Sequence, residues 1–164
     1  MESVPTVQFS TIYLGTDHAG FTLKEVIKSW LQKQSVTVID CGATVFDGED
    51  DFPDYVIPAA KAVTAFGPQA GAVVFGGSGQ GEAIAANRLP GIRTTVFYGG
   101  DVRIVSLGRE HNDANVLSLG ARFLTEEEAI AAVATWLSTP AMTAEKYHRR
   151  NKKIDHQTKL EKTI

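Results

Sequence analysis

The sequence predicts an α/β protein: a three-layer α/β/α sandwich on a Rossmann-like, five-stranded parallel sheet, with an additional C-terminal helix. Short apolar segments that suit buried strands alternate with segments whose apolar residues recur at helical spacing. Right-handed crossovers between parallel strands should place helices on both faces of the sheet. Because 164 residues suit one domain with a single core, we expect residues 1–164 to form one domain.

Five segments are expected to be strands because each is a short, mostly apolar run that ends near a turn or a glycine. The first ends at Gly15-Thr16, the second is left through Cys41-Gly42, and the third runs directly into a glycine-rich loop. The expected strands are residues 11–16, 36–40, 70–75, 92–98 and 115–119.

The segments between them have helical character. Residues 21–34 carry Leu23, Ile27 and Leu31 at helical spacing. An acidic, turn-rich loop at 47–54 precedes a helix in which Pro58 should be confined to the first turn. Further helices are expected over 82–88, over 101–108, from a capping box at Thr125 and Glu128 to Ser138, and over about 144–162.

Composition excludes several classes of protein. Hydrophobic residues make up 43% and charged residues 21%, as in an ordinary globular protein. Every apolar run is shorter than the roughly 20 residues that cross a bilayer, so we expect no membrane span. The start, MESVPTVQFS, has an acid and lacks Lys and Arg, unlike a targeting signal. A single cysteine, Cys41, excludes an internal disulfide and favours the cytoplasm.

Charge is unevenly distributed along the chain. Residues 145–162 hold seven Lys or Arg and three acids, a net charge of +4, which leaves −7 for the rest. An acidic body argues against extended nucleic-acid binding. The basic tail suits a solvated helix end, a phosphate clamp or an RNA-binding arm, and composition alone favours the solvated helix.

The architecture indicates where chemistry should lie, because ligands of such sheets bind at the carboxyl ends of the strands. Asp17 and His18 follow the first strand, the loop GGSGQG at 76–81 follows the third, and residues near 98–101 and 120–122 follow the last two. Candidate functional side chains are therefore expected to meet at this edge.

The loop GGSGQG has four glycines in six residues and runs from a strand into a helix. Its backbone N–H groups can turn toward one anion without interference from β-carbons, and the helix N-terminus adds a favourable dipole. The loop lacks the dinucleotide and P-loop motifs. A tight turn is the simpler explanation, but the glycine content favours a site for a phosphate or an oxyanion.

Glu82 begins the helix after this loop, and two interpretations are equally open. An acid in a first turn stabilises the helix dipole. The same position also directs a carboxylate at whatever the loop binds, where it can abstract a carbon-bound proton.

Histidines and cations supply further candidates. His18 is at the expected ligand edge, and His111 lies in a polar segment, 109–113, which we interpret as a loop before the fifth strand. Zinc spacings are absent, so a metal site is not expected, and Ser78 lacks the nucleophile-elbow motif. Arg122 can bind a phosphate in bidentate fashion. Lys146 and Arg150 share a helix face, with ion pairs to residues 126–128 as the alternative.

Several motifs in this order together resemble the RpiB/LacAB family of sugar-phosphate isomerases. The resemblance runs from about residue 12 to 155. The matching segments are GTDHAGFTLK (15–24), IDCGA (39–43), DFPDY (51–55), GGSGQGEAIAANR (76–88), GIR (91–93), REHNDANVLSLGAR (109–122) and the basic tail.

The resemblance implies aldose–ketose interconversion of ribose 5-phosphate and ribulose 5-phosphate through a cis-enediolate, without metal or other cofactor. One subfamily uses a cysteine at the position matching Gly76, and the other uses a glutamate that matches Glu82, which is then the base. The loop residues Gly77, Ser78, Gly79, Gln80 and Gly81 match the stabiliser of the enediolate oxygen, which places Ser78 among the catalytic residues with Glu82 and His111.

Further roles follow from the same resemblance. His111 matches the acid that opens the sugar ring, and Asn112 matches a substrate contact. Asp17 and His18 match residues that bind the sugar and its phosphate end. Phosphate-binding arginines match Arg122 and Arg150, while a third corresponds to Lys146, which keeps the charge but loses the bidentate fork. Tyr147 stands where the family tail has a histidine.

Family members are homodimers or dimers of dimers, in which the histidine that matches His111 and residues of the C-terminal tail complete the active site of the partner subunit. The resemblance therefore implies a phosphosugar as the small-molecule partner and shared active sites. Two alternatives stay open: an isomerase of a six-carbon sugar 6-phosphate of allose or galactose type, and a non-catalytic phosphosugar-binding module.

Overall fold

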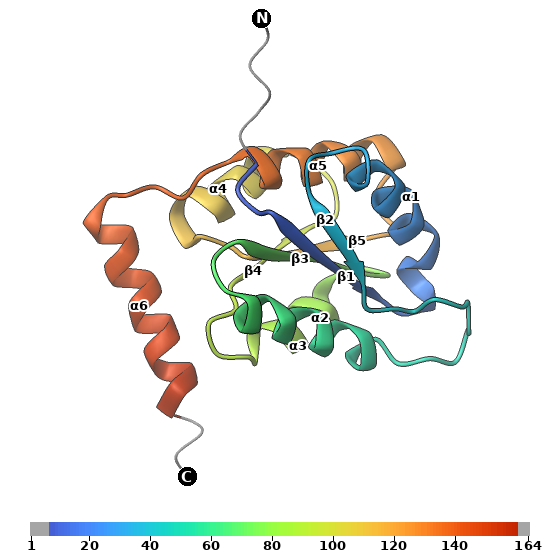
Figure 1. Cartoon of the computed structure of the whole chain (residues 1–164), viewed down its shortest axis with the longest axis horizontal. Helices are drawn as coiled ribbons and strands as arrows, with labels where there is room; N and C mark the ends of the chain where they lie inside the picture. Colours follow the sequence, from blue (N-terminus) through green and yellow to red (C-terminus); the bar gives the residue numbers. More distant parts are fainter. Residues whose placement is uncertain (1–6, 161–164) are drawn as a thin grey trace, which may run out of the picture.

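The computed structural model describes residues 7–160 and contains one five-stranded parallel sheet within them, in the order β2-β1-β3-β5-β4. Helices α1, α4 and α5 cover one face and α2 and α3 the other (Figure 1). The expected three-layer sandwich is confirmed. The strands are β1 (Thr11–Thr16), β2 (Thr37–Asp40), β3 (Ala70–Gly76), β4 (Thr94–Phe97) and β5 (Val116–Gly120). The helices are η1 (His18–Gly20, a 3₁₀ turn), α1 (Phe21–Leu31), α2 (Pro53–Phe66), α3 (Gln80–Asn87), α4 (Arg103–Asn112), α5 (Glu126–Ser138) and α6 (Glu145–Leu160).

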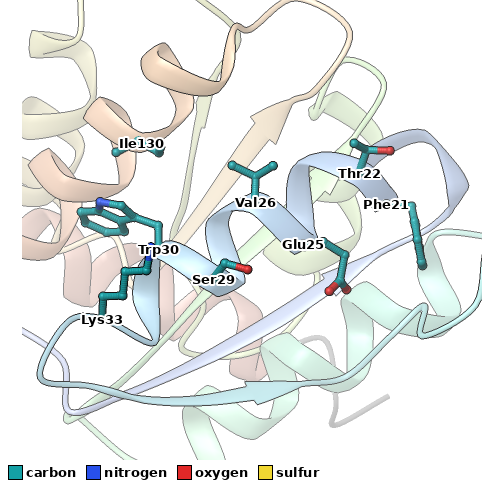
Figure 2. A pocket seen from close by; sticks show the side chains of 8 residues that line it. All are labelled: Phe21, Thr22, Glu25, Val26, Ser29, Trp30, Lys33 and Ile130. Carbon is teal, nitrogen blue, oxygen red and sulfur yellow. The ribbon is translucent and has the colours of Figure 1, made fainter.

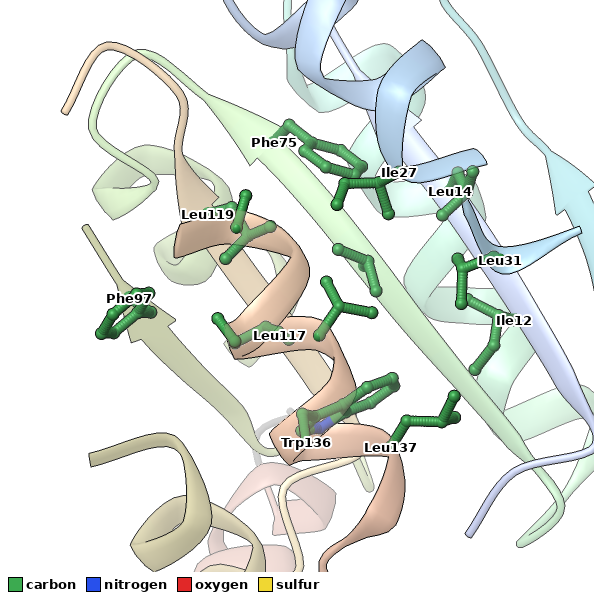
Figure 3. Packing of buried hydrophobic residues seen from close by; sticks show 14 of the residues in the cluster. Ile12, Leu14, Ile27, Leu31, Phe75, Phe97, Leu117, Leu119, Trp136 and Leu137 are labelled. Carbon is green, nitrogen blue, oxygen red and sulfur yellow. The ribbon is translucent and has the colours of Figure 1, made fainter. Parts of the chain in front are cut away.

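Two apolar layers hold the sandwich together. Every residue of β3 is buried, as expected for the central strand of a doubly covered sheet. On one face, side chains of β1, β3 and β5 pack against α1 and α5, with Trp136 at the base of the cluster (Figure 3). On the other face, alanines and valines of α2 pack on the sheet. Helix α2 comes so close that a β-carbon at Gly15 would lie 2.6 Å from the Tyr55 carbonyl oxygen.

Helix α4 corrects the sequence interpretation. Residues 109–113 were expected to form a loop, but the helix continues to Asn112 and ends at Asp113 with a positive φ of 46°. The apolar pattern of the sequence does not reveal this last turn, because the side chain that the turn buries is the charged Arg109. The Arg109 guanidinium donates hydrogen bonds to Asp113 Oδ1 and to the Ala114 carbonyl, both at 2.8 Å.

Helix α2 also differs from expectation. It begins at Pro53, so Pro58 lies in the second turn rather than the first. Pro58 and the residue four positions earlier, Asp54, are both exposed, so the hydrogen bond that proline removes is lost on the solvent side of the helix. The first strand, β1, has its expected bounds, and the other strands differ from theirs by one or two residues, a normal uncertainty at element ends.

Helix α6 stands beside the sandwich rather than on it (Figure 1). It contacts the end of α4: the Asn151 side-chain amide donates to the His111 carbonyl at 3.2 Å, and the ring of Tyr147 stacks on the His111 ring. Asp155 forms an ion pair with Arg93 at 2.9 Å. The expected helix over 144–162 therefore corresponds to α6, with residues 161 and 162 outside the described part of the chain.

Among residues 7–160, no helix combines the length and apolar character needed to cross a bilayer.

Candidate active site

The carboxyl ends of β1, β3 and β5 form one connected edge, as expected. The loop after β5 is tied to the loop after β3, because Ala121 N–H donates to the Gly76 carbonyl at 2.8 Å and Arg122 N–H donates to the Gly77 carbonyl at 3.1 Å. The Thr16 hydroxyl donates to the Phe75 carbonyl at 2.9 Å, which links β1 to the same point. Residues that leave these three strands are therefore held in fixed positions relative to one another.

The glycine loop turns sharply into α3. Gly79 has a φ of +76°, a conformation that favours glycine, and its carbonyl accepts a 2.6 Å hydrogen bond from the Ser118 hydroxyl. Ser78 Oγ accepts from Gln80 N–H at 3.3 Å, so this hydroxyl supports the loop turn. With Gly77 and Gly81 in the same turn, the loop presents backbone N–H groups at a helix N-terminus, as an anion site requires.

Glu82 is buried directly above the end of β3. Its side chain is 5% exposed, and its carboxyl group occupies the space that a β-carbon would take at Gly76. Burial is the main cause that raises the pKa of Glu82 above its usual value, and the nearby charge of Asp17 raises it further against an opposing backbone hydrogen bond. A buried carboxyl of raised pKa beside an anion-binding loop is well suited to exchange protons with a bound substrate.

Asp17 and His18 lie at the same edge. Asp17 is 7% exposed, and its Oδ1 accepts from Ala19 N–H at 2.9 Å, which caps the short η1 turn. His18 is held by Asp50, whose Oδ1 accepts from the His18 backbone N–H at 2.9 Å and lies 2.8 Å from ring Nδ1. The ring of Phe46 approaches the His18 ring edge-on at 6.3 Å.

Arg122 lies across the glycine loop. A β-carbon at Gly77 would be 3.1 Å from Arg122 Nη1, so the guanidinium rests over the glycine backbone. The residue is exposed, and its positive charge is felt at His18, where it opposes protonation of the ring. The Arg122 guanidinium therefore lies over the loop at Gly77, in a position suited to bind a phosphate.

His111 and Asn112 lie at the opposite edge of the sheet. The Asn112 carbonyl accepts from Arg93 Nε at 2.7 Å, and Arg93 directly precedes β4. The length of β5 alone separates this position from the Glu82 edge by about 13 Å, at about 3.3 Å per residue. A single chain therefore does not bring His111 or Asn112 to Glu82.

The tail cations lie with His111 rather than with Glu82. Lys146 Nζ sits 4.9 Å from the centre of the Tyr147 ring, and that ring stacks on His111 at 4.6 Å with an interplanar angle of 8°. Arg150 is exposed on α6, and Arg149 pairs with Glu145 at 2.6 Å. This arrangement forms a second, basic group of candidate residues that faces away from its own chain's glycine loop.

Two other features of the molecule resemble binding sites. Asp17, His18 and Asp50 each place a potential metal-ligand atom within 4.8 Å of the others, but the shortest of these separations is the His18–Asp50 hydrogen bond, which already engages ring Nδ1. A groove of about 660 Å³ between α1 and α5 is lined mainly by apolar surface (Figure 2). None of its lining residues is a candidate site residue: Phe21, Thr22, Glu25, Val26, Ser29, Trp30, Lys33 and Ile130.

Cys41 packs against the second apolar cluster, as expected of a small hydrophobic residue. Burial raises the pKa of its thiol, and the negative charge of Asp40 adds to this, so the thiolate is disfavoured at neutral pH.

Asp50 is the functional candidate that sequence reasoning did not single out. It lies in an acidic run, Glu49-Asp50-Asp51, in which all three residues have similar chemistry. The structure turns Asp50 inward while both neighbours are exposed. The sequence carries no signal that separates Asp50 from these two neighbours.

Comparison with known proteins agrees with this geometry. A family model described as Ribose/Galactose Isomerase matches residues 12–154. The chain is 41% identical over 152 residues to ribose-5-phosphate isomerase B of Mycolicibacterium paratuberculosis, covering 93% of this chain and 92% of that protein. Among solved structures, ribose-5-phosphate isomerase B of Mycoplasma genitalium with bound ribulose-5-phosphate superposes with a TM-score of 0.86 at 31% identity, covering 94% and 99% of the two chains. The corresponding Clostridium thermocellum enzyme gives 0.84 at 35% identity, covering 92% and 98%. Glycine loop, buried acid and sheet order thus occur in a chain that belongs to the ribose/galactose isomerase family.

Proposed function

We propose that this protein interconverts ribose 5-phosphate and ribulose 5-phosphate, with Glu82 as the base that moves a proton between C1 and C2. The observation that carries the proposal is the Glu82 carboxyl group, buried over Gly76 and adjacent to the glycine loop. The relatives named above are ribose-5-phosphate isomerases, and one was solved with ribulose-5-phosphate bound. Both facts favour a five-carbon substrate over a six-carbon one.

The chemistry follows from the position of the acid. A proton on a carbon next to a carbonyl is weakly acidic, so its removal needs a base and a means of stabilising the enediolate oxygen. Burial makes the Glu82 carboxylate more basic than an exposed one. The N–H groups of residues 77–81 and the N-terminus of α3 supply fixed positive dipoles for the oxygen. One such donor contributes about 2.7–4 kcal/mol in a comparable oxyanion hole.

The phosphate group is assigned to the cationic side of the same edge. Arg122 lies over Gly77, and His18 lies close enough to feel its charge. Asp17 is buried and its charge acts on both His18 and Glu82, so it is suited to accept hydrogen bonds from sugar hydroxyls. A phosphate dianion bound here draws the sugar across the loop so that its first two carbons reach the acid.

We further infer that active sites are shared between two chains. His111, Asn112, Lys146 and Arg150 lie on the far edge of their own sheet, so they reach a Glu82 edge when a second copy supplies them. A two-fold axis that brings one far edge to the partner's glycine loop builds two such sites at once. In this assembly His111 opens the sugar ring and the tail cations close around the phosphate.

The first experiment compares ribose 5-phosphate with allose 6-phosphate in a coupled isomerase assay with a chelator present. We expect turnover of the pentose phosphate that the chelator does not reduce. Glu82→Gln should lower kcat by about 10²–10⁴-fold, the usual contribution of a general base. Glu127→Gln, an exposed acid in the first turn of α5, serves as the matched control. Full activity of the Glu82→Gln protein, or preference for allose 6-phosphate, would refute the proposal.

The second experiment tests the shared site by mixing two inactive variants. Glu82→Gln chains are unfolded and refolded together with His111→Ala chains. Half of the resulting dimers contain one chain of each kind, and each of these has one intact site, so about a quarter of the wild-type activity should return. Each variant refolded alone is the control. Failure of the mixture to exceed the controls would show that Glu82 and His111 do not act across a chain boundary.

A further inference from the structure

The Asp50 carboxylate contacts both the backbone and the ring of His18. Its Oδ1 accepts from the backbone N–H at 2.9 Å and lies 2.8 Å from ring Nδ1, although the residues are 32 positions apart. The Asp50 side chain is 7% exposed and the His18 side chain 28%. The contact therefore joins a shielded carboxylate to a ring that still opens toward solvent and ligand.

Asp50 lies three residues before Pro53, the first residue of α2. The Tyr55 side chain in the first turn of that helix is near enough to lower the pKa of the Asp50 carboxyl. The Phe52 ring packs against Gly81 of the glycine loop, where an added β-carbon would meet it at 3.0 Å. One short segment thus contacts both the anion loop and the histidine.

The pairing decides which ring nitrogen is available. A carboxylate accepts hydrogen bonds and does not donate them, so the Nδ1 that faces Asp50 must carry a proton. Nε2 is then the nitrogen left for a ligand, and it donates a hydrogen bond to an anion when the ring carries its second proton. The edge-on contact with Phe46 restricts rotation of the ring from another side.

We propose that Asp50 is a positioning residue for phosphate recognition: it accepts Nδ1–H of the His18 ring, so that the protonated ring donates its Nε2–H to the phosphate. The inference rests on the proposed function in one respect, the assignment of His18 to the phosphate end of the substrate. Asp50 acts through His18 and does not touch the reacting carbons. It extends the candidate site to the acidic loop, to which the sequence assigned no role.

The charges around His18 determine how the pair responds to pH. The hydrogen bond to Asp50 is the largest cause that raises the pKa of His18, and the charge of Asp17, 4.0 Å away, acts in the same direction. Burial and the positive charge of Arg122 oppose it. Conversely, burial alone would raise the pKa of Asp50, but the hydrogen bonds from the His18 backbone and ring outweigh it and lower that pKa. Loss of the Asp50 charge should therefore lower the pKa of His18.

The test compares Asp50→Asn with Asp51→Asn, an adjacent exposed acid whose neutralisation changes the net charge equally. NMR titration of the ligand-free protein reports the His18 tautomer and pKa. We expect Nδ1–H in the neutral wild-type ring and a lower His18 pKa in Asp50→Asn alone. The dissociation constant for inorganic phosphate and KM for ribose 5-phosphate should each rise roughly tenfold, as expected for one weakened charge-assisted contact, with a smaller change in kcat.

A double mutant separates positioning from a structural effect. In a His18→Ala background, Asp50→Asn should cause no further rise in KM, since Asp50 would have no ring to position. The inference would be overturned if the Asp50→Asn and Asp51→Asn proteins had equal KM and equal phosphate affinity. It would also be overturned by additive effects in the double mutant, or by an Nε2–H tautomer in the neutral ring of the wild-type protein. The titration of the wild-type protein does not depend on whether any variant folds, and the measurement of phosphate binding does not depend on enzymatic activity. Absence of isomerase activity would refute the proposed function while these two measurements still decide the role of Asp50.

Discussion

Gly76→Ala should inactivate this protein without unfolding it. Gly76 ends β3 with an ordinary backbone conformation, so alanine can replace it there without backbone strain. The obstacle is the Glu82 carboxyl group, which occupies the space of the new β-carbon. Because β-carbon contacts below 3.0 Å are essentially never observed, the carboxyl must move by roughly 1 Å or more, and a misplacement of that size can lower a rate about 100-fold.

The assay measures kcat, KM and the melting temperature together. We expect kcat for ribose 5-phosphate to fall about 100-fold, because the base is displaced while the loop that binds the anion stays in place. KM should change little, since Arg122 rests over Gly77 and not over Gly76. Gly48→Ala is the matched control, because a β-carbon there meets nothing within 4 Å and its backbone does not require glycine. In a Glu82→Gln background the alanine should cause little further loss. An active Gly76→Ala protein would show that the carboxyl position seen here is not the catalytic one.

Three other predictions concern charge. The pKa of Glu82 is raised in the folded state, so the stability that its protonated form provides is complete below its ordinary pKa of 4.5 and is lost as pH rises through the folded pKa. Glu82→Gln should therefore increase the free energy of unfolding in urea at pH 7 but not at pH 4. A decrease at pH 7 would contradict this. Arg122→Ala should raise KM roughly tenfold with little change in kcat, whereas an unchanged KM would remove Arg122 from the phosphate site. Asp40→Ala should cost about 2 kcal/mol of unfolding free energy, because it removes the 2.6 Å partner from the fully buried Lys24 and leaves only the half-exposed Glu25 at 2.8 Å. Lys28→Ala, which removes a partly exposed partner of the same carboxylate, should cost under about 1 kcal/mol, and equal losses would contradict the burial argument.

The fold was predictable because the strands and helices have clear and different periods. The apolar runs at 11–16 and 70–75 became the buried strands β1 and β3, and the capping box at Thr125 and Glu128 starts α5 through reciprocal hydrogen bonds of 3.2 and 2.8 Å. Prediction missed the last turn of α4, where the charged side chain of Arg109 takes a buried position. Arg109 and Lys24 are both buried and paired, and hydrophobic periodicity contains no information about such partners.

The candidate site was predictable to the extent that strand order places loops together. Asp17, the glycine loop and Arg122 meet at the edge where the topology puts them. The identity of the inward-facing acid in the loop at 47–54 was not predictable, because Glu49, Asp50 and Asp51 differ by their geometry relative to α2 and not by their chemistry. Tertiary contact with His18 makes that choice.

The uneven charge of the chain is explained by the two edges of its sheet. Arg122 is the permanent cation at the Glu82 edge, with the titratable His18 ring nearby, and two buried acids, Asp17 and Glu82, lie at the same edge. Such an edge does not by itself neutralise a phosphate dianion. The surplus positive charge is on α6, which is fixed to the far edge through His111 and Tyr147. Folding one chain keeps the two groups apart at a distance set by strand length, whereas the two-fold dimer that we propose would bring each basic tail to the neighbour's glycine loop. In that proposed dimer the +4 tail and the −7 body would attract each other between chains, so the same division of charge would both steer association and complete the phosphate site.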